Sequence, residues 1–290
     1  MKDIYDIIRE WKKRRGESPS RTDGFALATL VRAEGSSYRR PGARMLIWKD
    51  GTTVGSLSAG CLEGEVAARA REVLETGEPA MMTFDTRRRF GCSGKIDIYL
   101  EPLDEDFFTG LANDLDLRRG HVAVTRFGEK EFVHEIHPPM RLFVVGEGPD
   151  NAPLLSLGNL LGWEIVEVVD PNSLSIQPDQ WTAAIVKTHN YGRDFVSLQR
   201  LLPLNIRYVG LIGPRKRRDQ LMNALLDVGV TINAGFFAPA GLDLAAETPE
   251  EIALAIVSEI QRVFGSGSGF SLRDRKIPIH ASTECKRLAR

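Results

Sequence analysis

The sequence RLFVVGEGPDN, residues 141–151, decides the fold expected for the second half of the chain. Its apolar run predicts a buried strand, and the glycines that follow predict a tight turn into a helix. Glycines at such a turn let the backbone approach a diphosphate group at the helix N-terminus. Gly146 and Gly148 are therefore candidate nucleotide-binding residues, with a purely structural tight turn as the alternative.

Strands and helices continue to alternate beyond this unit. Further strands are expected at 164–169, 183–187 and 208–212, and helices at about 151–161, 192–202, 215–228 and 249–263. Such alternation predicts a parallel sheet with helices on both faces. The last helix opens with Thr248-Pro249-Glu250-Glu251, the pattern of a capping box. We expect residues 139–264 to form a Rossmann-like, doubly wound parallel-sheet domain.

The preceding residues predict a different architecture. Helices are expected at the N-terminus and at 62–76, and strands at 25–31, 45–48, 52–56, 80–84, 96–100, 121–127 and 131–136. His137-Pro138-Pro139 closes this region, and the glycine-serine run at 265–269 begins a polar extension that is typical of a flexible linker. The sequence thus predicts an α/β protein: a mixed α+β domain over 1–138, the Rossmann-like domain, and a C-terminal extension over 265–290.

Composition limits the classes of function. The chain has 290 residues, 42% hydrophobic and 27% charged, which suits two globular domains. A net charge of -1 argues against a dedicated nucleic-acid-binding protein. Three cysteines do not make a disulfide framework, which favours a reducing, cytoplasmic compartment. We expect neither a signal peptide nor a membrane span, because no apolar run is long enough.

Candidate binding residues follow the expected strands of the second domain, where ligands bind in doubly wound sheets. Asp170 is suited to a ribose hydroxyl, and His189 lies on the same rim. Gly213 precedes Arg215 and Lys216, cations that suit a phosphate beside a helix N-terminus. The alternatives are a loop-bracing histidine and solvated cations. Asn151 stands where the dinucleotide fingerprint has its third glycine, so that fingerprint is incomplete.

The first domain contributes two candidate thiols. In GSLSAGCLEGE, residues 55–65, Gly60 precedes Cys61 at the start of a helix. That position lowers the pKa of a thiol and makes it a better nucleophile or metal ligand, whereas the alternative is a small buried cysteine. Cys92 lies in a second loop between Gly91 and Gly94. Their spacing does not predict a structural zinc site.

Two further stretches have weaker interpretations. The sequence GSSYRRPGAR, residues 35–44, combines small residues with arginines, which suits either an anionic oxygen or a solvated loop. His134 and His137 resemble a metal pair. However, residues three apart on a strand face opposite sides, so we interpret them as a strand edge.

The ordered set of motifs resembles the XdhC/CoxI family, the accessory proteins of xanthine dehydrogenase and related molybdenum hydroxylases. The resemblance covers nearly the whole chain. In the first domain it rests on residues 28–31, 34–37, 40–45, 55–65, 84–85, 91–94 and 101–102. In the second domain it rests on residues 188–189, 208–213, 239–244 and 247–253.

The resemblance implies a chaperone of the molybdenum cofactor rather than a turnover enzyme. Such a protein binds molybdopterin-bound metal, with or without a cytidine nucleotide. It assists sulfuration by a cysteine desulfurase and delivers the cofactor to a xanthine dehydrogenase-type apoenzyme; a homodimer is expected. Cys61 and Cys92 match the glycine-flanked cysteines of the family, and His189 and Gly213 match its second-domain motifs.

The chain departs from the family pattern at four positions. Glu147 and Pro149 interrupt the usual Gly-Ala-Gly-His of the first phosphate loop, and the Glu147 carboxylate weakens the dinucleotide interpretation. Ala59 and Ser93 replace glycine in the cysteine loops.

Three functional hypotheses follow. In the leading one, Cys61 contacts molybdenum or its terminal sulfur, because thiolates are soft ligands, in a cleft expected between the domains. The amides of 146–151, with Arg215 and Lys216, hold the pterin phosphate or its nucleotide. The second is an NAD(P)-dependent oxidoreductase in which Asp170 binds the ribose and His189 is the acid. The third is a sulfur carrier with a persulfide on Cys61 and no pterin site.

Overall fold

The computed structural model describes residues 2–17, 24–35, 37–85, 94–173, 175, 177–274 and 276. Cys92, Cys285 and most of the expected C-terminal extension lie outside these residues. The chain divides into two compact units, Met1–Pro138 and Pro139–Arg290, and each has its own hydrophobic cores.

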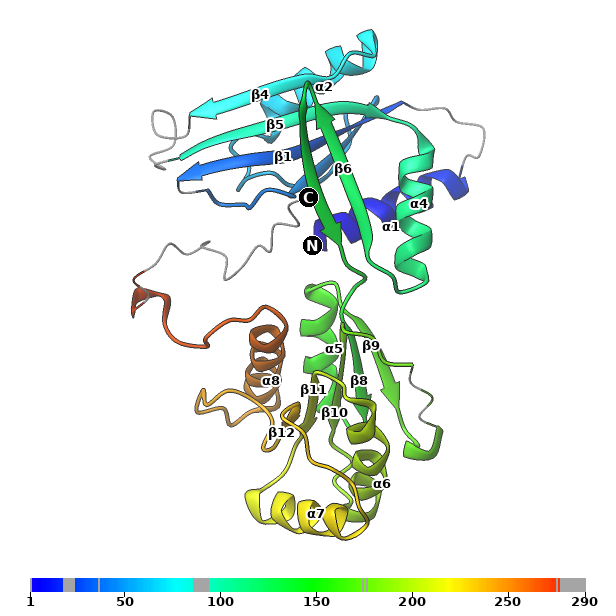
Figure 1. Cartoon of the computed structure of the whole chain (residues 1–290), viewed down its shortest axis with the longest axis vertical. Coiled ribbons are helices and arrows are strands. Elements are labelled where there is room, and N and C mark those ends of the chain that lie inside the picture. The colour runs from blue at the N-terminus through cyan, green and yellow to red at the C-terminus, as the bar shows by residue number, and fades with distance from the viewer. Residues whose placement is uncertain are drawn as a thin grey trace. The chain divides into compact units, whose positions relative to one another are not determined.

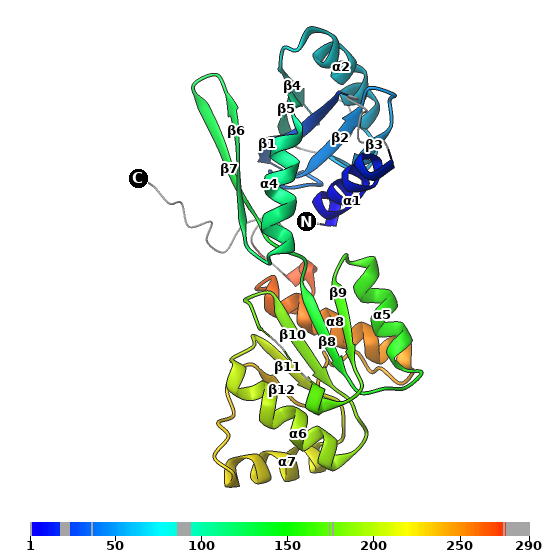
Figure 2. The same ribbon diagram turned by 90° about the vertical axis from the view of Figure 1, so that its right-hand side faces the viewer.

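The first unit is built on a five-stranded antiparallel sheet with the strand order β3-β2-β1-β5-β4. Its strands are β1 (Phe25–Gly35), β2 (Arg44–Trp48), β3 (Thr53–Gly55), β4 (Ala80–Asp85) and β5 (Gly94–Leu103). Helix α2 (Glu63–Thr76) packs on one face, and helices α1 (Lys2–Glu17) and α4 (Glu105–Asp116) pack on the other. Strands β6 (His121–Phe127) and β7 (Lys130–Ile136) form a separate antiparallel ribbon (Figures 1 and 2).

The alternation of side chains along β1 produces these two cores. Ala26 and Ala28 face the core with α2, whereas Phe25 and Leu27 face the core with α1 and α4. Because successive strand residues point to opposite faces, one strand serves both layers. Helix α4 is additional to the elements expected from the sequence, and Asp104 caps it by accepting a hydrogen bond from the Asp106 amide.

The second unit holds five parallel strands in the order β12-β11-β10-β8-β9. They are β8 (Arg141–Val145), β9 (Glu164–Val168), β10 (Thr182–Val186), β11 (Tyr208–Leu211) and β12 (Phe236–Phe237), the last not expected from the sequence. Helices α5 (Asn151–Leu160) and α8 (Pro249–Phe264) share one core with the sheet. Helices α6 (Tyr191–Leu201) and α7 (Arg215–Asp227) share the other (Figure 2). The doubly wound prediction is confirmed.

The strand order fixes where a ligand site belongs in this sheet. The chain runs from β8 outward to β9 and then crosses back to β10 on the other side of β8. In sheets of this topology, ligands bind outside the carboxyl ends of the strands at the point where the strand order reverses, which here lies between β8 and β10. At the far end of the chain, Thr248 and Glu251 form the expected capping box of α8.

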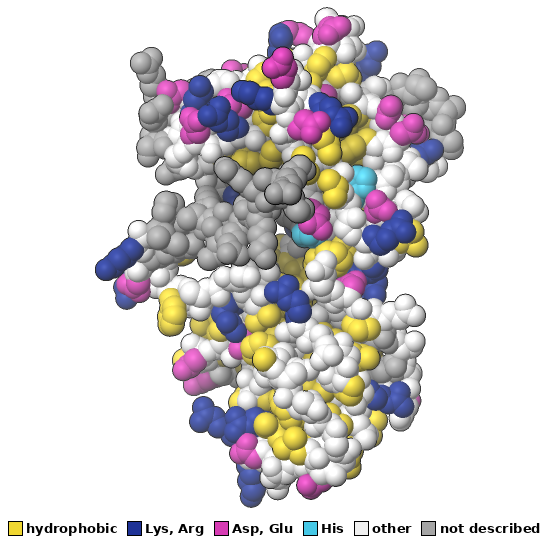
Figure 3. Space-filling view, in the orientation of Figure 1, with side chains coloured by type: hydrophobic (Ala, Val, Ile, Leu, Met, Phe, Trp, Pro, Cys, Tyr) yellow, Lys and Arg dark blue, Asp and Glu magenta, His cyan; other side chains and the backbone are white. Residues whose placement is uncertain are grey.

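On the face shown in Figure 3, basic and acidic side chains are interspersed over both units rather than gathered by sign. Within the described ranges, no helix is both long and apolar enough to cross a membrane.

Candidate functional site

The glycine loop after β8 is shaped by its contact with the end of β10. Gly146 has φ 124° and Gly148 has φ 147°, backbone conformations that favour glycine. A β-carbon on Gly146 would lie 2.6 Å from the carbonyl oxygen of Lys187. A β-carbon on Gly148 would lie 2.5 Å from Oδ1 of Asp150. Close packing within the loop therefore requires both glycines, whether or not a ligand binds.

Lys187 is the centre of a buried polar network that the sequence analysis missed. Its fully buried side chain follows β10, and its Nζ lies 2.7 Å from Asp150 Oδ1 and also donates to Asn151 Oδ1. Asn151 Nδ2 in turn donates to the Gly146 carbonyl at 3.1 Å and to Glu167 Oε1 at 2.7 Å. Asn151, where the fingerprint has a glycine, thus ties the loop to two strands.

Asp150 is held as a carboxylate at this rim. Partial burial alone would raise its pKa, but the hydrogen bond and charge of Lys187 outweigh it and lower the pKa. His189, with φ 54°, places Nε2 3.6 Å from the second carboxylate oxygen. The predicted His189 is therefore beside the glycine loop, with its ring exposed to solvent.

The cations at the start of α7 divide into two pairs. Arg215 and Lys216 are exposed, and neither has a hydrogen bond or ion pair among the described residues. Arg217 instead pairs with the buried carboxylate of Asp194, and Arg218 donates to the Ala238 carbonyl at 3.2 Å. The first pair is available to a ligand, and the second has structural partners.

Asp170 lies just beyond β9 and is engaged locally. Its Oδ1 accepts hydrogen bonds from the amide and side chain of Asn172, at 2.9 and 3.2 Å. It lines a cavity of about 500 Å³ together with Glu147 and Arg193. Arg193 Nη1 lies 3.5 Å from Glu147 Oε1, so the carboxylate expected to oppose a phosphate has a cationic partner.

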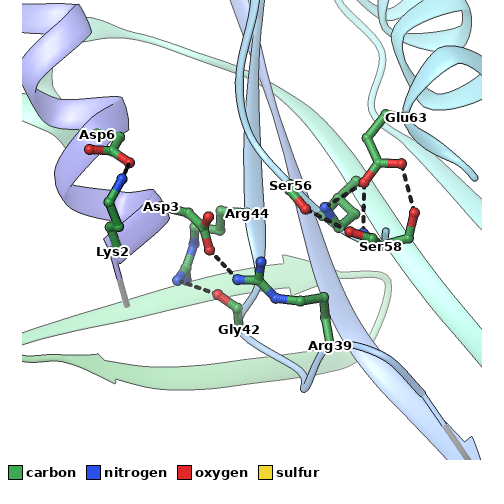
Figure 4. A network of polar contacts seen from close by, with 10 residues as sticks. Lys2, Asp3, Asp6, Arg39, Gly42, Arg44, Ser56, Ser58 and Glu63 are labelled. Carbon is green, nitrogen blue, oxygen red and sulfur yellow. Dashed lines mark hydrogen bonds and ion pairs between the residues drawn. The ribbon is translucent and has the colours of Figure 1, made fainter. Parts of the chain in front are cut away.

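Cys61 belongs to the first unit, in the loop that leads into α2 (Figure 4 shows this loop at Ser58 and Glu63). The Glu63 carboxylate accepts hydrogen bonds from Ser58 Oγ at 2.6 Å, from the Ser58 amide at 2.7 Å and from the Leu62 amide at 3.1 Å. Burial would raise the pKa of Glu63, but these hydrogen bonds lower it. A carboxylate thus already occupies the anion position at the start of α2.

The thiol itself is open to the surroundings. Cys61 is exposed, and its amide donates to Ser58 Oγ at 3.1 Å. Gly60, with φ 102°, would place a β-carbon in open space, so the backbone just before Cys61 is not packed against other parts of the chain that the structure describes. The alternative of a buried, packing cysteine is wrong. No group of three or more His, Cys, Asp or Glu in the described part of the chain is arranged to hold a metal ion.

The structure brings most of the predicted residues to one edge of the parallel sheet. Gly146, Gly148, Asp170, His189, Gly213, Arg215 and Lys216 all follow the carboxyl ends of its strands. Gly60 and Cys61 lie in the other unit, and Cys92 falls outside the described residues.

Comparison with known proteins accounts for both units. The sequence profile of the XdhC and CoxI family matches residues 20–85, and that of the XdhC Rossmann domain matches residues 142–260. The chain belongs to the XdhC and CoxI family. The two matched regions contain Cys61 and the whole sheet edge from Gly146 to Lys216.

Two relatives of this XdhC and CoxI family chain align over most of their lengths. It is 28% identical to a Bacillus subtilis protein named as a probable xanthine dehydrogenase subunit, over 81% of this chain and 91% of the relative. It is 26% identical to the molybdenum cofactor insertion chaperone PaoD of Escherichia coli, over 83% of each. A crystal structure described as a xanthine dehydrogenase from Bacillus halodurans has the same fold, with a TM-score of 0.74, 24% identity, and coverage of 91% of this chain and 97% of that one.

Proposed function

We propose that the protein is a maturation chaperone that binds the molybdenum cofactor as cargo and delivers it to a xanthine dehydrogenase-type apoenzyme. The observation that carries the proposal is the alignment with a molybdenum cofactor insertion chaperone over 83% of both chains. Because the alignment spans both units, the proposed role uses the whole chain and not only the Rossmann domain.

In the proposed complex, the edge of the parallel sheet holds the phosphate end of the cargo. Arg215 and Lys216 are exposed, have no partner among the described residues, and lie in the first turn of α7. Their charge and the positive end of the helix dipole act on the same volume, which suits an anionic group. The glycine loop at Gly146 and Gly148 lets backbone amides approach that group without a side chain in the way.

Cys61 is the proposed contact to molybdenum or to its terminal sulfur. Its thiol is exposed and the space beside the neighbouring Gly60 is open, which suits contact with a bulky cofactor. A thiolate is a soft donor, which matches a molybdenum–sulfur centre better than an oxygen ligand does. We assign assistance to sulfuration to the same residue, with a cysteine desulfurase as the source of sulfur and a homodimer in the reducing cytoplasm as the working form.

Anaerobic gel filtration of the protein with isolated molybdenum cofactor tests the proposal. Molybdenum and pterin fluorescence are expected to co-elute with the protein and to weaken in Cys61→Ala and in Arg215→Glu/Lys216→Glu. Arg126→Glu/Lys130→Glu, in the strands on either side of the turn of the β6–β7 ribbon, changes the same charge elsewhere and is expected to leave co-elution intact. Absence of co-elution for the parent protein would refute the chaperone function.

An NAD(P)-dependent oxidoreductase is the second candidate, because Asp170 lines a cavity beyond the second strand of a Rossmann domain. It predicts saturable NADH binding that falls in Asp170→Ala. The sulfur carrier predicts a persulfide on Cys61 without pterin co-elution. Fluorescence titration with NADH and mass spectrometry of Cys61 separate these outcomes from the chaperone.

A further inference from the structure

An apolar groove in the second unit begins where the glycine loop enters α5. It lies between the first two turns of α5 and of α8, helices that share a core on one face of the sheet (Figure 1), and it encloses about 680 Å³. Three proline rings and two leucine side chains form most of its walls: Pro149, Pro153, Pro249, Leu157 and Leu254. A mostly apolar lining around such a volume is typical of sites for small organic molecules.

The polar side chains at the rim of this groove offer hydrogen-bond acceptors. Asp150 and Glu250 contribute carboxylates, and Ser156 contributes a hydroxyl group. Glu250 is exposed and has no hydrogen bond or ion pair among the described residues. Asp150 pairs with Lys187 on its buried side, and 32% of its side chain remains exposed. The described lining contains no lysine, arginine or histidine, so the groove does not favour an anion.

The backbone adds few donors to the same rim. Proline has no N–H group, so Pro149, Pro153 and Pro249 contribute no amide donor. The amide of Ala152 donates to the Pro149 carbonyl at 3.3 Å and is therefore already paired. The groove suits a ligand that brings N–H donors to the carboxylates and flat apolar faces to the proline and leucine walls.

We propose that this groove holds the pterin ring system of the cargo, with the N–H donors of the ring facing Glu250 and Asp150. The assignment rests on the proposed chaperone function and names the part of the cargo that this face of the second unit recognises. A pterin is a flat heterocycle in which an amino group and a neighbouring ring N–H form a pair of donors. Such a pair matches the two oxygens of one carboxylate, and the faces of the ring can lie against the apolar walls.

The position of the groove allows Arg215 and Lys216 to hold the phosphate end of the same molecule. The groove begins at the loop after β8, whereas the two cations follow β11, which is two strands away in the sheet. Neighbouring strands are about 4.8 Å apart, so the carboxyl ends of β8 and β11 are about 10 Å apart. The uncharged ring and the anionic end of the cargo would thus meet acceptors and cations, respectively.

Fluorescence titration with neopterin, a soluble pterin without a phosphate group, tests the groove in the absence of metal and phosphate. The parent protein is expected to bind neopterin saturably at pH 7. Cytidine is expected to compete only at higher concentration, because its base has an amino group but no ring N–H beside it. Absence of saturable neopterin binding would overturn the proposal, and so would tighter binding of cytidine, which would assign the groove to a nucleotide instead.

Variants at exposed positions locate the binding without altering a buried group. Ala152→Trp is expected to prevent neopterin binding, because the indole ring fills the groove. Glu250→Gln is expected to weaken binding several-fold, because a charged acceptor is lost. Asn159→Trp, on the same helix but outside the lining, and Glu247→Gln, an exposed carboxylate just before α8, are the matched controls. Unchanged affinity in both Ala152→Trp and Glu250→Gln would overturn the assignment.

Gel filtration with the intact cofactor separates this inference from the chaperone function. Co-elution with the parent protein that is lost in Ala152→Trp but kept in Asn159→Trp would support both. Co-elution that is undiminished in Ala152→Trp would leave the chaperone function standing and overturn the role of the groove. Neopterin binding that depends on the groove, without co-elution of the cofactor, would refute the chaperone function and leave the groove as a pterin site.

Discussion

The Lys187–Asp150 pair gives the sharpest test of how the edge of the parallel sheet is held together. The Nζ–Oδ1 distance is 2.7 Å, and at an effective dielectric constant of about 20 two unit charges so placed attract by about 6 kcal/mol. Breaking a buried pair from one side costs about 3–5 kcal/mol. Asp150 is 32% exposed, and asparagine keeps one acceptor for Lys187, so we expect Asp150→Asn to destabilise the second unit by about 3 kcal/mol.

Amide hydrogen exchange at increasing urea concentration measures this loss within one unit. Peptides from β8 and β10 are expected to lose protection in Asp150→Asn, while peptides from β1 and β5, in a unit with its own cores, do not change. Adding Lys187→Met is expected to recover about 2 kcal/mol, because no uncompensated charge is left buried. Asp170→Asn removes an exposed carboxylate from the same edge and serves as the control.

The pH dependence supplies a second check on the same variant. The folded-state pKa of Asp150 is lowered, so its stabilisation is present above the ordinary aspartate pKa of about 4 and is lost as pH falls below that value. The difference in the free energy of unfolding between Asp150→Asn and the parent protein is therefore expected to shrink below about pH 4. Two results would refute the ion-pair reasoning. One is a loss of stability under about 0.5 kcal/mol in Asp150→Asn at pH 7, and the other is an equal change of unfolding free energy with pH in the two proteins.

Three further predictions concern single residues. Gly146→Ala is expected to lower the melting temperature of the second unit sharply, because the new β-carbon would lie 2.6 Å from the Lys187 carbonyl oxygen. Gly128→Ala, where a β-carbon would meet open space, is the control and is expected to cost about 1 kcal/mol of stability. Similar losses of stability in the two variants would contradict this. His134 binds protons less readily in the folded than in the unfolded protein. As the pH falls from about 6.5 to 4, the free energy of unfolding of the parent protein is therefore expected to drop by about 1.4 kcal/mol per pH unit relative to that of His134→Gln. Urea unfolding curves that shift equally with pH in the two proteins would contradict this. Thr248→Ala removes the N-cap of α8 and is expected to lower the stability of the second unit by about 1 kcal/mol. Amide hydrogen exchange in that helix should become faster, and unchanged exchange rates would contradict the prediction.

The fold of the second unit was predictable because its signals are local. The strand Thr182–Val186 is an uninterrupted buried run, and the capping box at Thr248 marks the start of α8. Helix α4 also carries local signals that the sequence analysis did not use: Asp104 caps it, and Phe108, Leu111 and Leu115 lie on its buried face at helical spacing. Strand β12, by contrast, has only two residues and exists because β11 pairs with it, which no local pattern shows.

The candidate site was predictable only where position along a strand determines it. Placing ligands at strand ends identified Gly146, His189 and Arg215. Lys187 follows an apolar strand, and a lysine there is expected to be solvated. Its burial depends on Asp150, contributed by a different loop. His134 was interpreted as a strand-edge residue, yet its ring contacts Arg44, which belongs to a different sheet.

The distribution of partners at the sheet edge bears on which ligand fits it. Asp150 compensates Lys187, Asp194 compensates Arg217, and Glu147 faces Arg193, so Arg215 and Lys216 carry the unmatched charge at the start of α7. Two exposed cations suit a terminal phosphate better than a dinucleotide diphosphate, which must also lie against the carboxylate of Glu147. Exposed charges are strongly screened by salt. Binding at this edge should therefore weaken steeply between low and physiological ionic strength, whereas the proposed contact through the Cys61 sulfur should change little.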